Sequence, residues 1–177
     1  MNAHLFGLSR IETFRQLIPA IGVLKSGGVV SDLQLSAVFG SPFEGRANDA
    51  MVLQLVDYFC LLGIEGVTLR DSSGAASPAE TAALCRRIVQ LYPHLTVTLH
   101  LNDATGLAAQ IRRAAADEGI VRFGLTGREL ALPGNMNMDL HIGTSLRYKA
   151  EVESYGFNTG INAENLSQIM QFGSVNI

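Results

Sequence analysis

The amino-acid sequence predicts an α/β fold built on a parallel sheet. Three observations support this prediction: strand-like and helix-like segments alternate, they repeat at roughly 30 residues, and polar residues follow the strand-like segments. A repeat of that length holds one strand, one loop and one helix, and such units join into parallel sheets through right-handed crossovers. We therefore expect one globular unit with its reactive side chains at the carboxyl ends of the strands.

Four short segments have the composition of buried strands. They are rich in β-branched and aliphatic residues, and glycine or polar residues follow them. These segments are Leu33–Phe39, Gly66–Leu69, Leu95–Leu99 and Ile120–Phe123. A glycine-containing loop that reaches Asn135 follows the last segment.

Helical segments lie before the first strand and between the strands. They run from Ser9 to Lys25, from about Asp49 to Leu62, from Pro78 to about Leu91, and from after Gly106 to about Glu118. Ser9 and Glu12 have the spacing of a capping box, and Ser77–Glu80 combines an N-cap serine, a proline at the first helical position and a glutamate at the third. Pro19 is expected to kink or split the first helix.

Composition excludes several classes of function. The chain has 177 residues, 47% of them hydrophobic, so it can bury a substantial core. A net charge of -3 with scattered Lys and Arg residues provides no basic patch for nucleic acid or an anionic membrane. No apolar run approaches the roughly 20 residues of a membrane span, and the N-terminus has no signal-peptide pattern. We expect a soluble, cytoplasmic protein in which Cys60 and Cys85 are free thiols.

Asp71 and His100 follow or end strands, where α/β proteins carry their reactive groups. Residues two apart on a strand project from the same face, so the imidazole of His100 and the amide of Asn102 are expected to face one pocket. Asn135 offers a further oxygen from a later loop. Mixed nitrogen and oxygen ligands of this kind suit Mg²⁺ or Mn²⁺. The alternative is that His100 only ends its strand and hydrogen-bonds locally.

Five segments, read in order, resemble signature segments of the HMG-CoA lyases. VFGSPFEGR (residues 38–46) resembles VFGCPYEG, GVTLRDSSGAASP (66–78) resembles SLGDTIGVGTP, TVTLHLNDATG (96–106) resembles AVHCHDTYG, FGLTGRELALPGN (123–135) resembles GLGGCPYAQGASGN, and GFNTGINAENL (156–166) resembles GIHTGVNLQKL. Five matches in the same order argue against chance.

The resemblance implies a fold and a reaction. HMG-CoA lyases are metal-dependent carbon-carbon lyases on a (β/α)8 TIM barrel, and they cleave 3-hydroxy-3-methylglutaryl-CoA to acetyl-CoA and acetoacetate. The matched segments resemble the C-terminal half of that barrel. We therefore expect residues 1–177 to form a single partial TIM-barrel domain, with about four parallel strands and flanking helices. An acyl-CoA is the implied substrate, and its retro-aldol cleavage needs a base and a Lewis acid.

The family's motifs also imply roles for particular residues of this chain. Catalytic roles are implied for Asp71, His100 and Asp139, of which the last stands where the family has an active-site glutamate. Metal ligation is implied for His100, Asn102 and Asn135. His100 matches the first histidine of the family's metal-binding H-x-H motif, and Asn102 stands at the second.

Three departures from the family favour impaired catalysis. An amide at Asn102 is a weaker ligand than imidazole, and Arg128 occupies the position of a loop cysteine that assists the reaction. The chain is also expected to lack the aspartate ligand and the arginine of the family's first strand. We therefore expect Mg²⁺ or Mn²⁺ to bind weakly if at all. Arg128 could bind a substrate carboxylate or a CoA phosphate, or be a solvated loop charge.

Four strands cannot close an eight-stranded barrel. They leave two open edges and an inner face that is expected to be apolar, so we expect a homo-oligomer or a partner that completes the barrel. Three functions follow as hypotheses: an HMG-CoA lyase-like carbon-carbon lyase, a catalytically inactive truncated remnant that acts as an interaction module, and another aldolase or acyltransferase of the same superfamily.

Overall fold

The chain consists of two compact units, Met1–Gly124 and Leu125–Ile177. The structure is a computed structural model that describes residues 7, 9–41, 45, 48–124, 138–165 and 168. Among the helices within these residues, none has the length and apolarity needed to cross a membrane.

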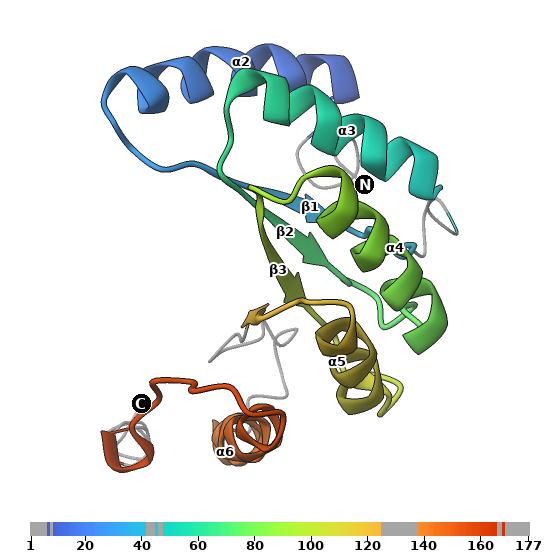
Figure 1. Ribbon diagram of the computed structural model, residues 1–177, viewed down its shortest axis with the longest axis vertical. Helices are drawn as coiled ribbons and strands as arrows, with labels where there is room; N and C mark the ends of the chain where they lie inside the picture. Colours follow the sequence, from blue (N-terminus) through green and yellow to red (C-terminus); the bar gives the residue numbers. More distant parts are fainter. Residues whose placement is uncertain are drawn as a thin grey trace. The chain divides into compact units, whose positions relative to one another are not determined.

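The first unit is a parallel sheet of four strands in the order β1-β2-β3-β4, with helices between them (Figure 1). Its elements are α2 (Arg10–Ser26), β1 (Asp32–Ser36), α3 (Asp49–Leu62), β2 (Gly66–Arg70), α4 (Pro78–Leu91), β3 (Thr96–His100), α5 (Ala108–Asp117) and β4 (Arg122–Gly124). The α/β class and the parallel pairing predicted from the sequence are confirmed.

The helices of this unit lie along one side of the sheet (Figure 1). That side carries the alternate apolar residues of the strands, among which Val67, Leu69 and Leu99 are at most 1% exposed. Helix α3 contributes Phe59, which is 1% exposed and makes an edge-to-face contact with Phe14 of α2 at a centroid distance of 5.5 Å. The hydrophobic core therefore lies between the sheet and its helices.

The other side of the sheet is polar. Because side chains alternate along a strand, this side carries every second residue of each strand. In register across the sheet, its three rows are Asp32, Gly66 and Thr96; Gln34, Thr68, Thr98 and Arg122; and Ser36, Arg70, His100 and Gly124. The expectation of an apolar inner face is wrong, since the apolar positions of the strands all face the helices.

The structure sharpens two further expectations about the elements. Helix α2 runs from Arg10 to Ser26 as one helix with Pro19 inside it, so the expected split is absent, while the expected kink stays a prediction. Pro19 is exposed, and its ring lies away from the core, where the missing hydrogen bond costs least. Strand β1 ends at Ser36 rather than Phe39, because Ala37 has a φ of 57° and turns the chain out of the strand.

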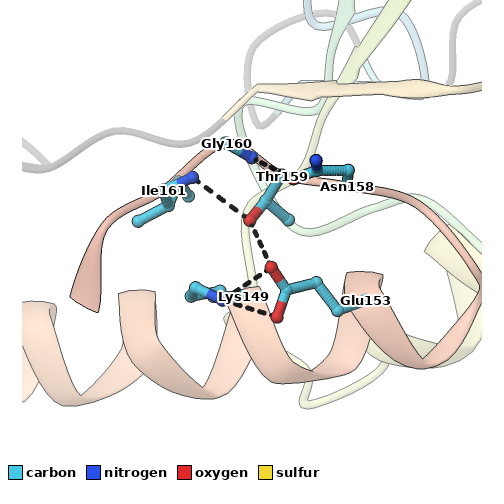
Figure 2. Close-up of polar contacts among 6 residues, drawn as sticks. All are labelled: Lys149, Glu153, Asn158, Thr159, Gly160 and Ile161. Atoms are coloured by element: carbon cyan, nitrogen blue, oxygen red, sulfur yellow. Dashed lines mark hydrogen bonds and ion pairs between the residues drawn. The ribbon is translucent and has the colours of Figure 1, made fainter.

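The described part of the second unit contains α6 (Met138–Ser154), a helix that the sequence patterns do not predict. Figure 2 shows how the segment after α6 folds back on it: the Glu153 carboxylate accepts hydrogen bonds from Lys149 Nζ at 2.6 Å and from Thr159 Oγ1 at 2.8 Å. The backbone N–H of Ile161 donates to Thr159 Oγ1, and that of Gly160 donates to Asn158 Oδ1. The Lys149 and Thr159 hydrogen bonds lower the pKa of Glu153.

Two positions on α3 provide a matched test of this core. Phe59→Ala should lower the free energy of unfolding by about 3–5 kcal/mol, because it removes a buried ring and leaves a cavity. Leu61→Ala on the same helix, at a position 80% exposed, should change it by less than about 0.5 kcal/mol. Urea unfolding followed by circular dichroism measures both. Equal effects of the two changes would contradict the described packing.

The thiol of Cys85 should be inert in the folded chain. Burial, and to a lesser degree the charge of Glu118, raise its pKa from 9.0 to about 12. At pH 8 it then carries about a thousandfold less thiolate than an ordinary cysteine, so iodoacetamide should modify it only after unfolding. The unfolded state releases this proton more readily, so stability should be retained below about pH 9 and should fall as the pH rises toward 12. Modification of Cys85 in the native state at the rate of a free thiol, mapped by mass spectrometry, would argue against this burial.

Candidate active site

His100 ends β3 at the carboxyl edge of the sheet, in register with Arg70 of β2 and Gly124 of β4. Its side chain is half-buried and lies over Gly124. A Cβ added at Gly124 would lie 3.2 Å from the Cβ and 3.3 Å from the Cγ of His100. Glycine at this position therefore leaves the space that the imidazole occupies. The strand pairing continues past His100, whose carbonyl oxygen accepts from the Asp71 N–H at 2.9 Å.

Asp71 begins the loop between β2 and α4 and is 2% exposed. Its carboxylate organises the backbone of that loop. Oδ1 accepts from the N–H groups of Ser73, Gly74 and Ala75 at 3.0–3.2 Å, and Oδ2 accepts from that of Ala76 at 3.1 Å. Both oxygens are thus committed to the protein's own backbone.

Asn102 lies in the loop after β3, and its amide is also engaged. Oδ1 accepts from the Ala104 N–H at 3.0 Å, and Nδ2 donates to the carbonyl oxygen of Ser72 at 3.3 Å. The first bond forms a turn within its own loop, and the second joins that loop to the loop after β2. Asn102 is therefore a connector between two loops.

The loop after β2 is joined to the loop after β1 as well. Ser72 Oγ accepts from the Ala37 N–H at 3.3 Å, and Ser73 Oγ donates to the Gly40 carbonyl oxygen at 3.0 Å. A shallow groove of about 530 Å³ lies between these loops and the start of α4. It is lined by Phe39, Gly40, Ser41, Gly45, Ser73, Ala75, Ser77 and Glu80. Its volume is within the range of small-molecule sites.

Arg70 is a candidate site residue that the sequence patterns did not single out. It occupies the same row as His100 on the polar side of the sheet and is half-buried. A signal was present in the sequence: Arg70 precedes Asp71 where the HMG-CoA lyase segment SLGDT has glycine, and period-two alternation puts it on the face of His100.

The remaining predicted residues cannot be assembled with His100. Arg128 and Asn135 lie outside the described residues. The backbone of Asp139 is in α6, in the second unit, and its side chain lies outside the described part. Of the predicted residues, the structure brings together Asp71, His100 and Asn102 at one end of the sheet.

These described residues do not fit a divalent metal ion. Mg²⁺ and Mn²⁺ prefer several oxygen ligands with carboxylates among them. Here the Asp71 carboxylate and the Asn102 oxygen already accept backbone hydrogen bonds, which leaves the imidazole of His100 as the main donor. Within the described ranges, no group of three or more His, Cys, Asp or Glu side chains could hold an ion.

Comparison with known proteins identifies relatives by sequence, although no protein-family model matches the chain. It is 32% identical to the (R)-citramalyl-CoA lyase of Chloroflexus aurantiacus over 100 residues. The matched residues make up 56% of this chain and 32% of that protein. It is 25% identical to the hydroxymethylglutaryl-CoA lyase of Pseudomonas mevalonii over 160 residues. This match covers 89% of this chain and 52% of that enzyme. The match thus spans about half the length of the hydroxymethylglutaryl-CoA lyase and about a third of the citramalyl-CoA lyase.

Solved structures show the same fold. The HMG-CoA lyase of Pseudomonas aeruginosa superposes with a TM-score of 0.75 at 20% identity, covering 99% of this chain and 60% of that one. The HMG-CoA lyase of Brucella melitensis gives a TM-score of 0.73 at 22% identity, covering 93% and 58%. The resemblance predicted from five segments is confirmed, and so is the fold class. By sequence and by fold, this chain is related to the HMG-CoA lyases and corresponds to part of their TIM barrel.

Proposed function

We propose that this chain forms part of a carbon-carbon lyase of the HMG-CoA lyase type, which cleaves a 3-hydroxy acyl-CoA by a retro-aldol reaction. The sequence relation along 89% of the chain carries the proposal. The position of His100 supports it, since active sites of this architecture lie at the carboxyl ends of the strands. The HMG-CoA lyase of Acinetobacter baumannii was solved in complex with coenzyme A and 3-methylmalate, which are ligands of the proposed class.

His100 is the base that we propose for this reaction. Its neutral imidazole takes the proton of the substrate hydroxyl, the adjacent carbon-carbon bond breaks, and a carbonyl forms at the former hydroxyl carbon. The electron pair of the broken bond moves to the carbon next to the thioester. The imidazolium then returns its proton to that carbon, which gives acetyl-CoA and, from an HMG-CoA substrate, acetoacetate. Atoms and charge balance within this sequence.

Further strands are needed around this site. In the described sheet, β1 and β4 form the two edges, and the described helices of this unit lie along the side opposite to His100 (Figure 1). We propose that a second copy of the chain or another polypeptide completes the barrel over that side. A polar lining fits this proposal, because a barrel interior that binds a charged substrate must carry polar groups near its mouth.

A different acyl-CoA substrate has a specific observation in its favour. The match of highest identity given above is to a protein named (R)-citramalyl-CoA lyase, although it covers only 100 residues. Citramalyl-CoA should therefore be assayed beside HMG-CoA. A non-catalytic role as an interaction module is favoured by the engaged oxygens of Asp71 and Asn102, and absence of turnover with both substrates would support it.

The lyase proposal predicts a weak activity that depends on His100. Purified full-length chain at high concentration should release acetoacetate from HMG-CoA, and the activity should elute from size exclusion with species larger than one chain. His100→Ala should reduce the rate by about 10²-fold or more, the contribution of a general base. His94→Ala is the matched control, since His94 is exposed and lies before β3. No turnover in any fraction, or equal rates for both variants, would overturn the proposal.

Asp71 is proposed to hold the loop rather than to exchange protons. Asp71→Asn should lower the free energy of unfolding by about 1–3 kcal/mol, because the new amide N–H₂ faces backbone N–H groups that have lost an acceptor. Asp103→Asn is the control: Asp103 Oδ1 accepts a hydrogen bond from the backbone N–H of Ala108 at 3.0 Å, which an asparagine oxygen can also accept. Urea unfolding compares them. Unchanged stability of Asp71→Asn would contradict the structural role.

A further inference from the structure

Arg70 and His100 stand side by side on the polar side of the sheet, at its carboxyl edge. We propose that they form an anion-binding site that takes a carboxylate group of the substrate. In this site the permanent positive charge of Arg70 takes the role of the divalent metal ion that the family resemblance implies. The carboxylate class rests on the proposed function. The existence of an anion site rests on the positive charges that Arg70 and Arg122 place on this side of the sheet.

The geometry places the two side chains within reach of one ligand. Arg70 and His100 are register partners on neighbouring strands, which lie roughly 4.8 Å apart, and residues in register project to the same side. Arg70 is half-buried, so part of its side chain is withdrawn from solvent on this side of the sheet. Among the described residues, no hydrogen-bond or ion-pair partner is found for this guanidinium.

The charges around this pair favour an anion. The row with His100 and the row below it contain Arg70 and Arg122, and no carboxylate among their strand residues. Asp32 is the acid among the strand residues of this side; it lies at the opposite end of β1 and accepts a hydrogen bond from Thr68 Oγ1 at 2.8 Å. The Asp71 carboxylate follows Arg70 in the chain, and it is already occupied by four backbone N–H groups of its own loop. A surface with two guanidinium groups and an imidazole attracts an anion and repels a dication.

Two differences from the family segments act in the same direction. The segment TLRDS has Arg70 where the family segment SLGDT has glycine, which adds a permanent positive charge beside His100. The segment HLND has Asn102 at the second position of H-x-H, and the oxygen of that amide is already engaged by Ala104. Arg70 supplies a positively charged side chain, and Asn102 removes a histidine ligand that would hold a metal ion. Guanidinium binds carboxylate through two parallel hydrogen bonds, so it suits this task.

Glutarate is the probe for the anion site. It is a dicarboxylate without a hydroxyl group, so its binding does not depend on metal chelation. In the presence of EDTA, glutarate should shift the imidazole NMR signals of His100 in the full chain in a saturable manner. Arg70→Gln should weaken this binding about tenfold or more, the effect of one charge-assisted hydrogen-bonded pair. Arg70→Lys should retain part of it, because the charge remains.

The matched control is Arg87→Gln, the same change at an exposed position on α4. It should leave glutarate binding unchanged. If Arg70 only stabilised the fold, glutarate would not shift the NMR signals of His100 in a manner that depends on Arg70. The titration therefore distinguishes a role of Arg70 in glutarate binding from a role in folding. Circular dichroism of each variant confirms that the sheet is intact.

Mn²⁺ is the second probe, because it broadens the signals of nearby nuclei. In the parent chain, Mn²⁺ at about 0.1 mM should leave the His100 signals sharp. Broadening of His100 at that concentration, or a His100 shift with glutarate that is equal in parent and Arg70→Gln, overturns the inference, and so does the absence of any glutarate effect. Glutarate binding that depends on Arg70 without acyl-CoA cleavage would instead leave the anion site standing and remove the lyase proposal.

Discussion

The candidate site depends on one buried interaction, the hydrogen bonding of the Asp71 carboxylate to four successive backbone N–H groups. A carboxylate that accepts several backbone bonds satisfies groups that would otherwise be unpaired in a buried loop. The loop after β2 is held in one shape as a result. Through Ser72 and Ser73 it then holds the loop after β1, and through Asn102 the loop after β3. The carboxyl edge of the sheet is therefore one connected structure in which His100 has a defined neighbourhood.

A second constraint is the division of the sheet into an apolar and a polar side. The helices cover the apolar side and form the core there, so the stability of the first unit comes from that side. The polar side takes no part in the core. Its residues are consequently free to differ in chemistry from those of related proteins, and Arg70 is such a difference.

Much of the fold could be predicted from the sequence, because it is encoded locally. The capping box at Ser9 and the proline start of α4 define helix ends through short-range hydrogen bonds, and both are present. The polar inner side follows only from the alternate positions of each strand, which an overall count of apolar residues does not separate. The strand end at Ala37 and the uninterrupted helix through Pro19 depend on backbone geometry and exposure that no short pattern records.

The candidate site was predictable in its position and less so in its chemistry. His100 could be placed at a strand end from periodicity alone, and the structure agrees. The engaged state of the Asp71 and Asn102 oxygens could not be foreseen, because their partners belong to loop backbones whose conformation arises only in the folded chain. Arg70 required both the strand register and a comparison with the family segment.

The turn at Ala37 has a consequence for association. It ends β1, which forms one edge of the described sheet, after five residues. Long free edges recruit any other strand through backbone hydrogen bonds, which is the route to amyloid-like stacking. An edge of five residues offers few such bonds, so a neighbouring chain must also match the arginines, threonines and histidine of the polar side. Recognition at this edge therefore depends on side chains more than on backbone hydrogen bonds.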